Sequence, residues 1–251
     1  MNQKRFAQSY SRREMLKALG LGSAAIFFGY EQLRSMLDGA AGFESGAMAA
    51  NLPGCVVRPE QTEGPYFVDE KLNRVDIRPD PGTGKASAGA PLDLEIRVYR
   101  VANGTCTPYQ NAIVDIWQCD AMGVYSDVKD TNGFFNTAGQ KFLRGYQVTD
   151  ATGVAKFTTV YPGWYQGRSV HIHFKVRSSL AARASEFTSQ LYFDDAFSDK
   201  VLARAPYNTK TGTRTPNERD GIYRQGGKQL TLAVTEQGAG YRGVFEIGVT
   251  A

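Results

Sequence analysis

The sequence predicts an all-β protein, a β-sandwich with loop-rich flanks and few short helices. Three observations predict this fold class. Apolar and polar residues alternate from Leu92 onward, turn signals separate short runs rich in Val, Ile, Tyr and Phe, and 27 of the 251 residues are glycine. Alternation is the pattern of a strand with one buried face, and several short strands separated by turns are typical of a sandwich.

The strands follow one another along the chain with turn residues between them. Leu92, Leu94, Ile96 and Val98 face one side of the first strand, and the polar residues between them face the other. Further strands are predicted at residues 112–118, 153–160, 170–176, 188–193, 229–235 and 241–249. One helix is expected inside the domain, at residues 198–204, with Ser198 as its N-cap.

We interpret residues 1–49 as an export signal and spacer. Arg12 and Arg13 precede a mostly apolar run at residues 18–30, which is too short to favour a membrane span. The pair resembles a twin-arginine signal, which predicts a periplasmic or extracellular protein with no stable membrane span once the signal is removed. The alternatives are an amphipathic N-terminal helix and an uncleaved anchor. Residues 50–91 are expected to be a loop-rich N-terminal arm, and residues 92–251 the β-sandwich domain.

The charge of the chain gives no reason to expect a nucleic-acid partner. The formal net charge is +4, and residues 1–49 supply +2 of it through six basic and four acidic residues, which leaves +2 for the remainder. So small an excess, with no basic cluster, does not indicate binding to a polyanion.

Three cysteines, Cys55, Cys106 and Cys119, are the only thiols. In an oxidising compartment two of them could pair, and the sequence leaves open which two. Cys119 follows an apolar run and is a candidate core residue.

The chain has two histidines, His171 and His173, within a predicted strand. Residues two apart in a strand share a face and lie about 6–7 Å apart at the backbone, so both imidazoles can converge on one ion. Imidazole suits zinc, copper, nickel and iron alike, so the pair predicts a metal site without choosing the metal. The alternative is a pair of hydrogen-bonded histidines with no metal.

Five segments around this pair carry a family resemblance. They are residues 62–67 (TEGPYF), 116–120 (IWQCD), 123–126 (GVYS), 161–174 (YPGWYQGRSVHIHF) and 189–193 (SQLYF). In this order they closely resemble the intradiol ring-cleavage dioxygenases, the catechol and protocatechuate dioxygenases. The resemblance covers residues 55–249 and implies that the sandwich, residues 92–251, is the catalytic domain.

The resemblance also implies a metal, with one non-haem iron(III) per chain. Tyr125 and Tyr165 match the family's two tyrosinate ligands, and His171 and His173 match its two imidazole ligands. A free phenol has a pKa near 10, so tyrosine is a ligand at neutral pH only when a strong Lewis acid such as iron(III) displaces its proton.

Three residues match the family's catalytic positions. Tyr165 corresponds to the axial ligand that leaves the metal when substrate binds, Arg168 to the arginine beside the substrate ring, and Gln190 to the glutamine that flanks the same pocket. Without the motif, any one of the 13 tyrosines would be read as a packing residue, as we read Tyr66, Tyr161 and Tyr192.

The implied reaction uses O2 to cleave a catechol between its two hydroxylated carbons and yields a muconate-type diacid. The sequence shows no basic cluster for a carboxylated ring, so catechol or a substituted catechol is the expected substrate, and an oligomer is possible. Two other function classes stay open. One is a non-catalytic, transthyretin-like sandwich that only binds a partner; the other is a zinc hydrolase, which lacks an obvious third ligand beside the histidines.

Overall fold

The computed structural model describes residues 56–250 except 104 and 131–132. The predicted export signal at residues 1–49 and Cys55 therefore lie outside the described residues. Among the residues that are described, no helix has the length and apolar character needed to cross a membrane.

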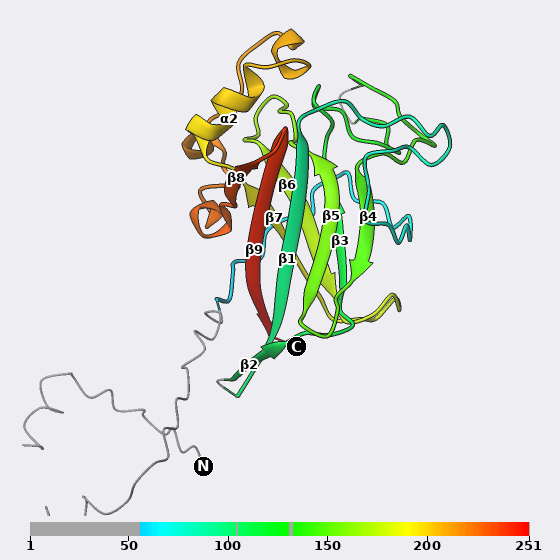
Figure 1. The fold of residues 1–251 in the computed structure, drawn as a ribbon, viewed down its shortest axis with the longest axis vertical. Coiled ribbons are helices and arrows are strands. Elements are labelled where there is room, and N and C mark those ends of the chain that lie inside the picture. The colour runs from blue at the N-terminus through cyan, green and yellow to red at the C-terminus, as the bar shows by residue number, and fades with distance from the viewer. Residues whose placement is uncertain (1–55, 104, 131–132, 251) are drawn as a thin grey trace, which may run out of the picture. The chain divides into compact units, whose positions relative to one another are not determined.

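Two β-sheets face each other and enclose the core, as Figure 1 shows. The strands of the first sheet are β1 (Pro91–Ala102), β2 (Thr105–Pro108), β5 (Val154–Val160), β8 (Ala233–Gln237) and β9 (Gly240–Thr250). Strand β1 is central: it pairs parallel with β9, and antiparallel with β5 along its first half and with β2 at its end.

The second sheet is antiparallel, with the order β4–β3–β6–β7. Its strands are β3 (Ile113–Trp117), β4 (Arg144–Val148), β6 (His171–Arg177) and β7 (Glu186–Tyr192). Leu94 and Ile96 of the first sheet and Ile172 and Phe174 of the second belong to one cluster of buried apolar side chains. Because side chains alternate along β6, its histidines must lie on the other face of the sheet.

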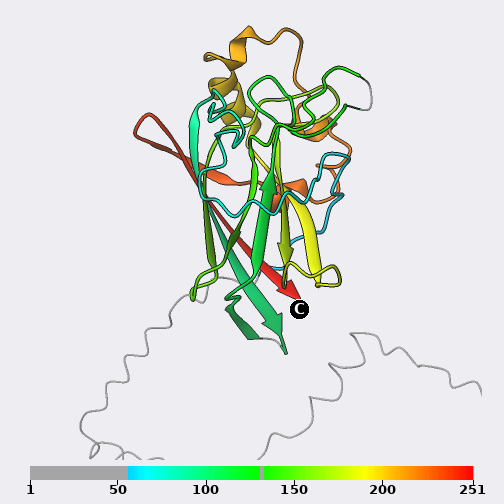
Figure 2. The same cartoon turned by 90° about the vertical axis from the view of Figure 1, so that its right-hand side faces the viewer.

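Helical segments and long loops gather at one end of the sandwich, and β2 lies at the other (Figure 1). They are α2 (Asp195–Leu202) and three 3₁₀ turns, Tyr207–Thr209, Asn217–Arg219 and Gly227–Leu230. The N-terminal arm from residue 56 crosses the outer face of the second sheet before β1 begins (Figure 2). Backbone hydrogen bonds fix it there, from Gln61 N to Thr188 O (3.0 Å) and from Tyr146 N to Leu72 O (2.8 Å).

The predicted fold class is confirmed, but two predicted elements are wrong in detail. The expected strand at residues 229–235 begins only at Ala233, because Leu230 reaches the core from a 3₁₀ turn and so imitates strand alternation. The helix begins at Asp195 and its N-cap is Asp194, whose side chain accepts a hydrogen bond from Phe197 N. Ser198 lies inside the helix, where its hydroxyl bonds instead to Asp194 O and Tyr161 Oη.

Strands β2 and β4 were not predicted. Strand β4 contains Gly145, which weakens any sequence signal for a strand. A side chain there would meet the arm, because an added Cβ would lie 3.1 Å from Leu72 O.

The structure narrows the choice of cysteines that form a disulfide. Cys106 is disulfide-bonded, whereas Cys119 is free. Cys119 is also buried, as expected of a core residue. Burial raises the pKa of the Cys119 thiol to about 12, so it stays protonated.

Candidate active site

His171 and His173 open strand β6 on the outer face of the second sheet. Their cross-strand neighbours on β7 are Tyr192 and Gln190, and Trp117 on β3 lies beside His173. Both imidazoles are buried, and their Nε2 atoms are 3.1 Å apart. The expected convergence of the two rings is therefore present.

Hydrogen bonding and stacking fix the direction of each imidazole. His171 Nδ1 lies 2.6 Å from Ser169 O and donates to it, which leaves the Nε2 lone pair free. The His173 ring stacks on Trp117, with centroids 4.9 Å apart, and its Nδ1 finds no hydrogen-bond partner among the described residues. The arm closes over this ring, since a Cβ added at Gly64 would lie 3.4 Å from His173 Cε1.

Tyr125 comes from the loop between β3 and β4, and it is fully buried. Its backbone carbonyl accepts a hydrogen bond from Thr137 Oγ1 (2.6 Å), and Arg144 of β4 donates from Nε to Ser126 Oγ (2.8 Å). These bonds hold the loop so that Tyr125 Oη lies 3.3 Å from His171 Nε2.

Tyr165 and Arg168 belong to the loop between β5 and β6. A turn in which Arg168 N donates to Tyr165 O (3.3 Å) brings both side chains to the same place. Tyr165 Oη lies 3.2 Å from His171 Nε2, and Arg168 Nη1 lies 3.4 Å from Tyr165 Oη.

Three atoms thus surround the single lone pair of His171 Nε2 at 3.1–3.3 Å: two phenol oxygens and the second imidazole nitrogen. Ligands about 2.1 Å from one ion and at right angles to each other are about 3 Å apart, so this spacing fits a shared metal ion. In the described part of the chain, no group of three or more His, Cys, Asp or Glu side chains could hold a metal. A site built on the histidines therefore needs the tyrosines.

The protonation states suit a strong Lewis acid. Burial, with the Arg168 charge second, lowers the pKa of His171 to about 3, and burial holds the pKa of His173 well below its ordinary value of 6.5. Burial raises the pKa of Tyr165 to about 12 and that of Tyr125 well above 10. At neutral pH the imidazoles are uncharged and ready to bind, while both phenols keep their protons until a metal displaces them.

Arg168 is held at the site by Gln190 and by Asp220, a residue that the sequence did not reveal. Arg168 Nη2 donates to Gln190 Oε1 (2.5 Å), and Gln190 Nε2 donates to Thr62 O (2.9 Å). Arg168 Nε donates to Asp220 Oδ2 (3.0 Å), which also accepts from Ser169 N and Oγ.

Asp220 is 1% exposed, and no local motif marks it. Burial opposes its ionisation, but the Ser169 hydrogen bonds and the Arg168 charge outweigh burial and hold its pKa below the ordinary value.

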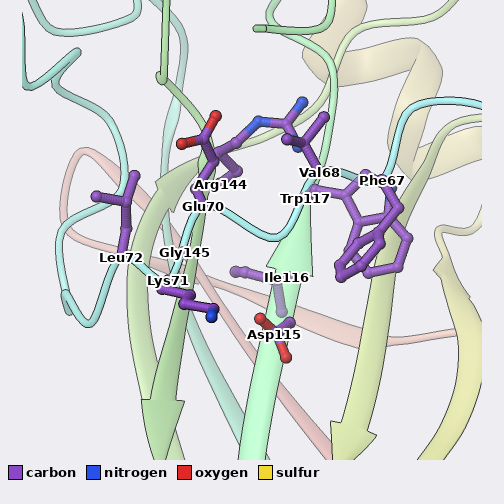
Figure 3. A pocket seen from close by; sticks show the side chains of 10 residues that line it. All are labelled: Phe67, Val68, Glu70, Lys71, Leu72, Asp115, Ile116, Trp117, Arg144 and Gly145. Carbon is purple, nitrogen blue, oxygen red and sulfur yellow. The ribbon is translucent and has the colours of Figure 1, made fainter. Parts of the chain in front are cut away.

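Two cavities of very different size adjoin the site. A small one of about 10 Å³ lies behind Trp117, where Figure 3 shows Phe67 of the arm beside the indole and Arg144 above it. It is too small for a substrate. The larger one, a groove of about 930 Å³, opens beside Tyr165 and Tyr66. Tyr66 thus does more than pack: it stacks on Tyr125, with centroids 4.6 Å apart, and also lines the groove.

Comparison with known proteins assigns the family. Residues 62–215, more than half of the chain, match the family model described as Dioxygenase. A solved intradiol ring-cleavage dioxygenase from Tetranychus urticae is 30% identical, with a TM-score of 0.66 over 78% of this chain and 95% of that chain. The chain belongs to the intradiol ring-cleavage dioxygenase family. The predicted family and enzyme class, an oxidoreductase, are confirmed.

Two further proteins resemble this chain over part of its length. The protocatechuate 3,4-dioxygenase beta chain of Burkholderia cepacia is 30% identical over 151 residues, 57% of this chain, so the chain spans about 60% of that relative. The dioxygenase domain of a dioxygenase carbohydrate-binding protein fusion from Streptomyces sp. SirexAA-E is 24% identical, with a TM-score of 0.54 over 78% of this chain and 99% of that chain. This second likeness shows the fold.

Proposed function

We propose that this dioxygenase cleaves a catechol or substituted catechol between its hydroxylated carbons with O2, giving a muconate-type diacid, and that it uses one iron(III) per chain. Tyr125, Tyr165, His171 and His173 would hold the metal. The observation that carries the proposal is the convergence of one buried phenol, one half-buried phenol and two neutral imidazoles around one point. Phenolate oxygen is a hard anionic donor that suits a trivalent ion, and this donor set separates the site from a zinc hydrolase.

The protein's own groups have distinct parts in this chemistry. Bound iron(III) would supply the Lewis acidity that ionises the diol and activates its ring toward O2. Tyr165 lies at the groove and Tyr125 is enclosed, so Tyr165 Oη, once the metal had displaced its own proton, would be the phenolate oxygen placed to take a proton from an entering diol. Arg168, 3.4 Å from that oxygen, is placed to stabilise negative charge on the substrate with its permanent cation.

Metal analysis and colour test the proposal first. Aerobically purified protein should contain about one iron per chain and be red-brown from phenolate-to-iron charge transfer. A colourless, iron-free protein would count against the enzyme, and stoichiometric zinc would favour the hydrolase. Oxygen uptake with a panel of catechols, and identification of the acid product, would then define the reaction.

Replacement of one ligand tests its assignment. Tyr165→Phe should change the visible band and slow turnover sharply, because a phenolate donor is lost. Tyr161→Phe is the matched control, since Tyr161 is a fully buried tyrosine of the same loop whose hydroxyl bonds to Ser198 away from the site. Wild-type colour and turnover in Tyr165→Phe would remove that residue from the centre.

We also propose that the protein is exported by a twin-arginine route. The support is the Arg12–Arg13 pair before an apolar run, together with the disulfide at Cys106, because disulfides persist in oxidising compartments. Replacement of both arginines by lysine should block export. Unchanged export would show that the pair is not the signal.

A further inference from the structure

The groove beside the metal donors is far larger than one substrate ring requires. It begins at Tyr165 and Tyr66 and has a volume of about 930 Å³. Pockets of about 300–1,000 Å³ enclose ligands of drug size, whereas a catechol is a single ring with two hydroxyls. Volume therefore remains beyond the position at which a diol would meet the metal ligands.

Aromatic side chains supply the large apolar surfaces of this groove, beside polar and charged residues. Tyr66, Phe134, Phe135 and Trp164 all contribute to it. Phe134 is 80% exposed, the most of any large hydrophobic side chain in the described part of the chain. Aromatic surface left in water at the edge of a pocket next to a reactive centre is typical of a site for an apolar ligand group.

Two charged residues line the groove, Asp130 and Lys210, and both already contact other parts of the protein. Asp130 accepts a hydrogen bond from Tyr66 Oη (2.5 Å). Lys210 donates a hydrogen bond to Met122 O, and its ammonium lies 4.7 Å from the centroid of the Trp164 ring. The wall beside it is closely packed, since a Cβ added at Gly212 would lie 3.1 Å from Trp164 Cη2. Lys210 therefore braces the aromatic wall and is poorly placed to anchor a substrate carboxylate.

We propose that the groove binds the second ring of an aryl-substituted catechol while the diol occupies the metal site. The inference rests on the proposed function for the position of the diol. It goes further by naming the substrate class as two-ring catechols. Stacking of the second ring on an aromatic side chain of the groove should raise the affinity about threefold to tenfold per good contact.

The test compares 4-phenylcatechol with catechol and with protocatechuate. Steady-state oxygen uptake gives kcat/KM for each in the iron-loaded protein. Equilibrium binding to the metal-free protein is followed by tryptophan fluorescence, because Trp164 lines the groove. Wild-type protein should bind and cleave 4-phenylcatechol best. Phe134→Ala should lower the preference for 4-phenylcatechol over catechol about threefold to tenfold, and Thr211→Trp, which fills the groove, should lower it further.

Leu180→Ala is the matched control, because it also truncates an exposed apolar side chain but lies in the loop after β6, far along the strand from His171. It should leave the preference unchanged. The inference is overturned if wild-type protein prefers catechol or protocatechuate, or if neither groove variant shifts the preference. Binding that favours 4-phenylcatechol without cleavage of any diol would instead refute the proposed function and leave the groove assignment standing.

Discussion

Asp220→Asn should damage both stability and catalysis, although Asp220 is not proposed as a metal ligand. Its Oδ2 accepts three hydrogen bonds, from Arg168 Nε at 3.0 Å, Ser169 N at 3.0 Å and Ser169 Oγ at 2.9 Å. The substitution keeps the volume but removes the charge that faces Arg168, whose side chain is only 15% exposed. Loss of one partner of a buried ion pair costs about 3–5 kcal/mol, and Arg168 keeps its bond to Gln190, so we expect about 3 kcal/mol.

Urea unfolding of the variant and wild type would measure this loss, with the slope m expected to stay the same. The guanidinium would also lose its orientation, so kcat/KM for a catechol should fall by an order of magnitude or more while iron content is retained. Asp199→Asn is the control: Asp199 also pairs with an arginine, Arg214, but its side chain is 67% exposed, so about 1 kcal/mol or less is expected. A change within about 1 kcal/mol for Asp220→Asn, with normal turnover, would show that Asp220 does not hold Arg168 in place.

Two further predictions concern the core and the dependence on pH. Phe174→Ala should lower the free energy of unfolding by about 3–5 kcal/mol, because Phe174 is fully buried. Phe134→Ala should change it by less than about 0.5 kcal/mol, because Phe134 is 80% exposed. Equal effects of the two substitutions in urea titrations would contradict this account of the core. In iron-free protein the folded pKa of His171 is about 3, below the value of about 6.5 for an unfolded chain. The stability that a neutral His171 contributes is therefore complete above about pH 6.5 and is lost as the pH falls, by up to about 1.4 kcal/mol per pH unit. The free energy of unfolding, measured at pH 7, 6 and 5 after chelation of metal, should fall more steeply with decreasing pH in wild type than in His171→Asn. Parallel falls in the two proteins would show that His171 is not buried in its neutral form.

The sequence predicted most of the sandwich because burial of one strand face requires apolar and polar residues to alternate, and this alternation is visible within a few consecutive residues. Residues 92–98 show it directly, and β1 has this pattern of burial. The prediction failed at Leu230, where a 3₁₀ turn and not a strand places the apolar side chain in the core. It failed again where a hydroxyl expected to cap a helix bonds to another part of the structure. Ser198 has the residue type of a cap, yet its hydroxyl is used by Tyr161 and by its own helix.

For the site, the sequence by itself determined that two histidines share a strand face, since a spacing of two residues leaves no other arrangement. The family motifs singled out Tyr125, Tyr165, Arg168 and Gln190 as candidate partners. Only the tertiary structure decided that Tyr125, 46 residues before His171, meets it at 3.3 Å, and that Asp220, 52 residues after Arg168, holds the guanidinium. Strand periodicity is a property of neighbours in the chain, whereas these contacts depend on how loops from different strands close over one end of a sheet, and no local pattern records that.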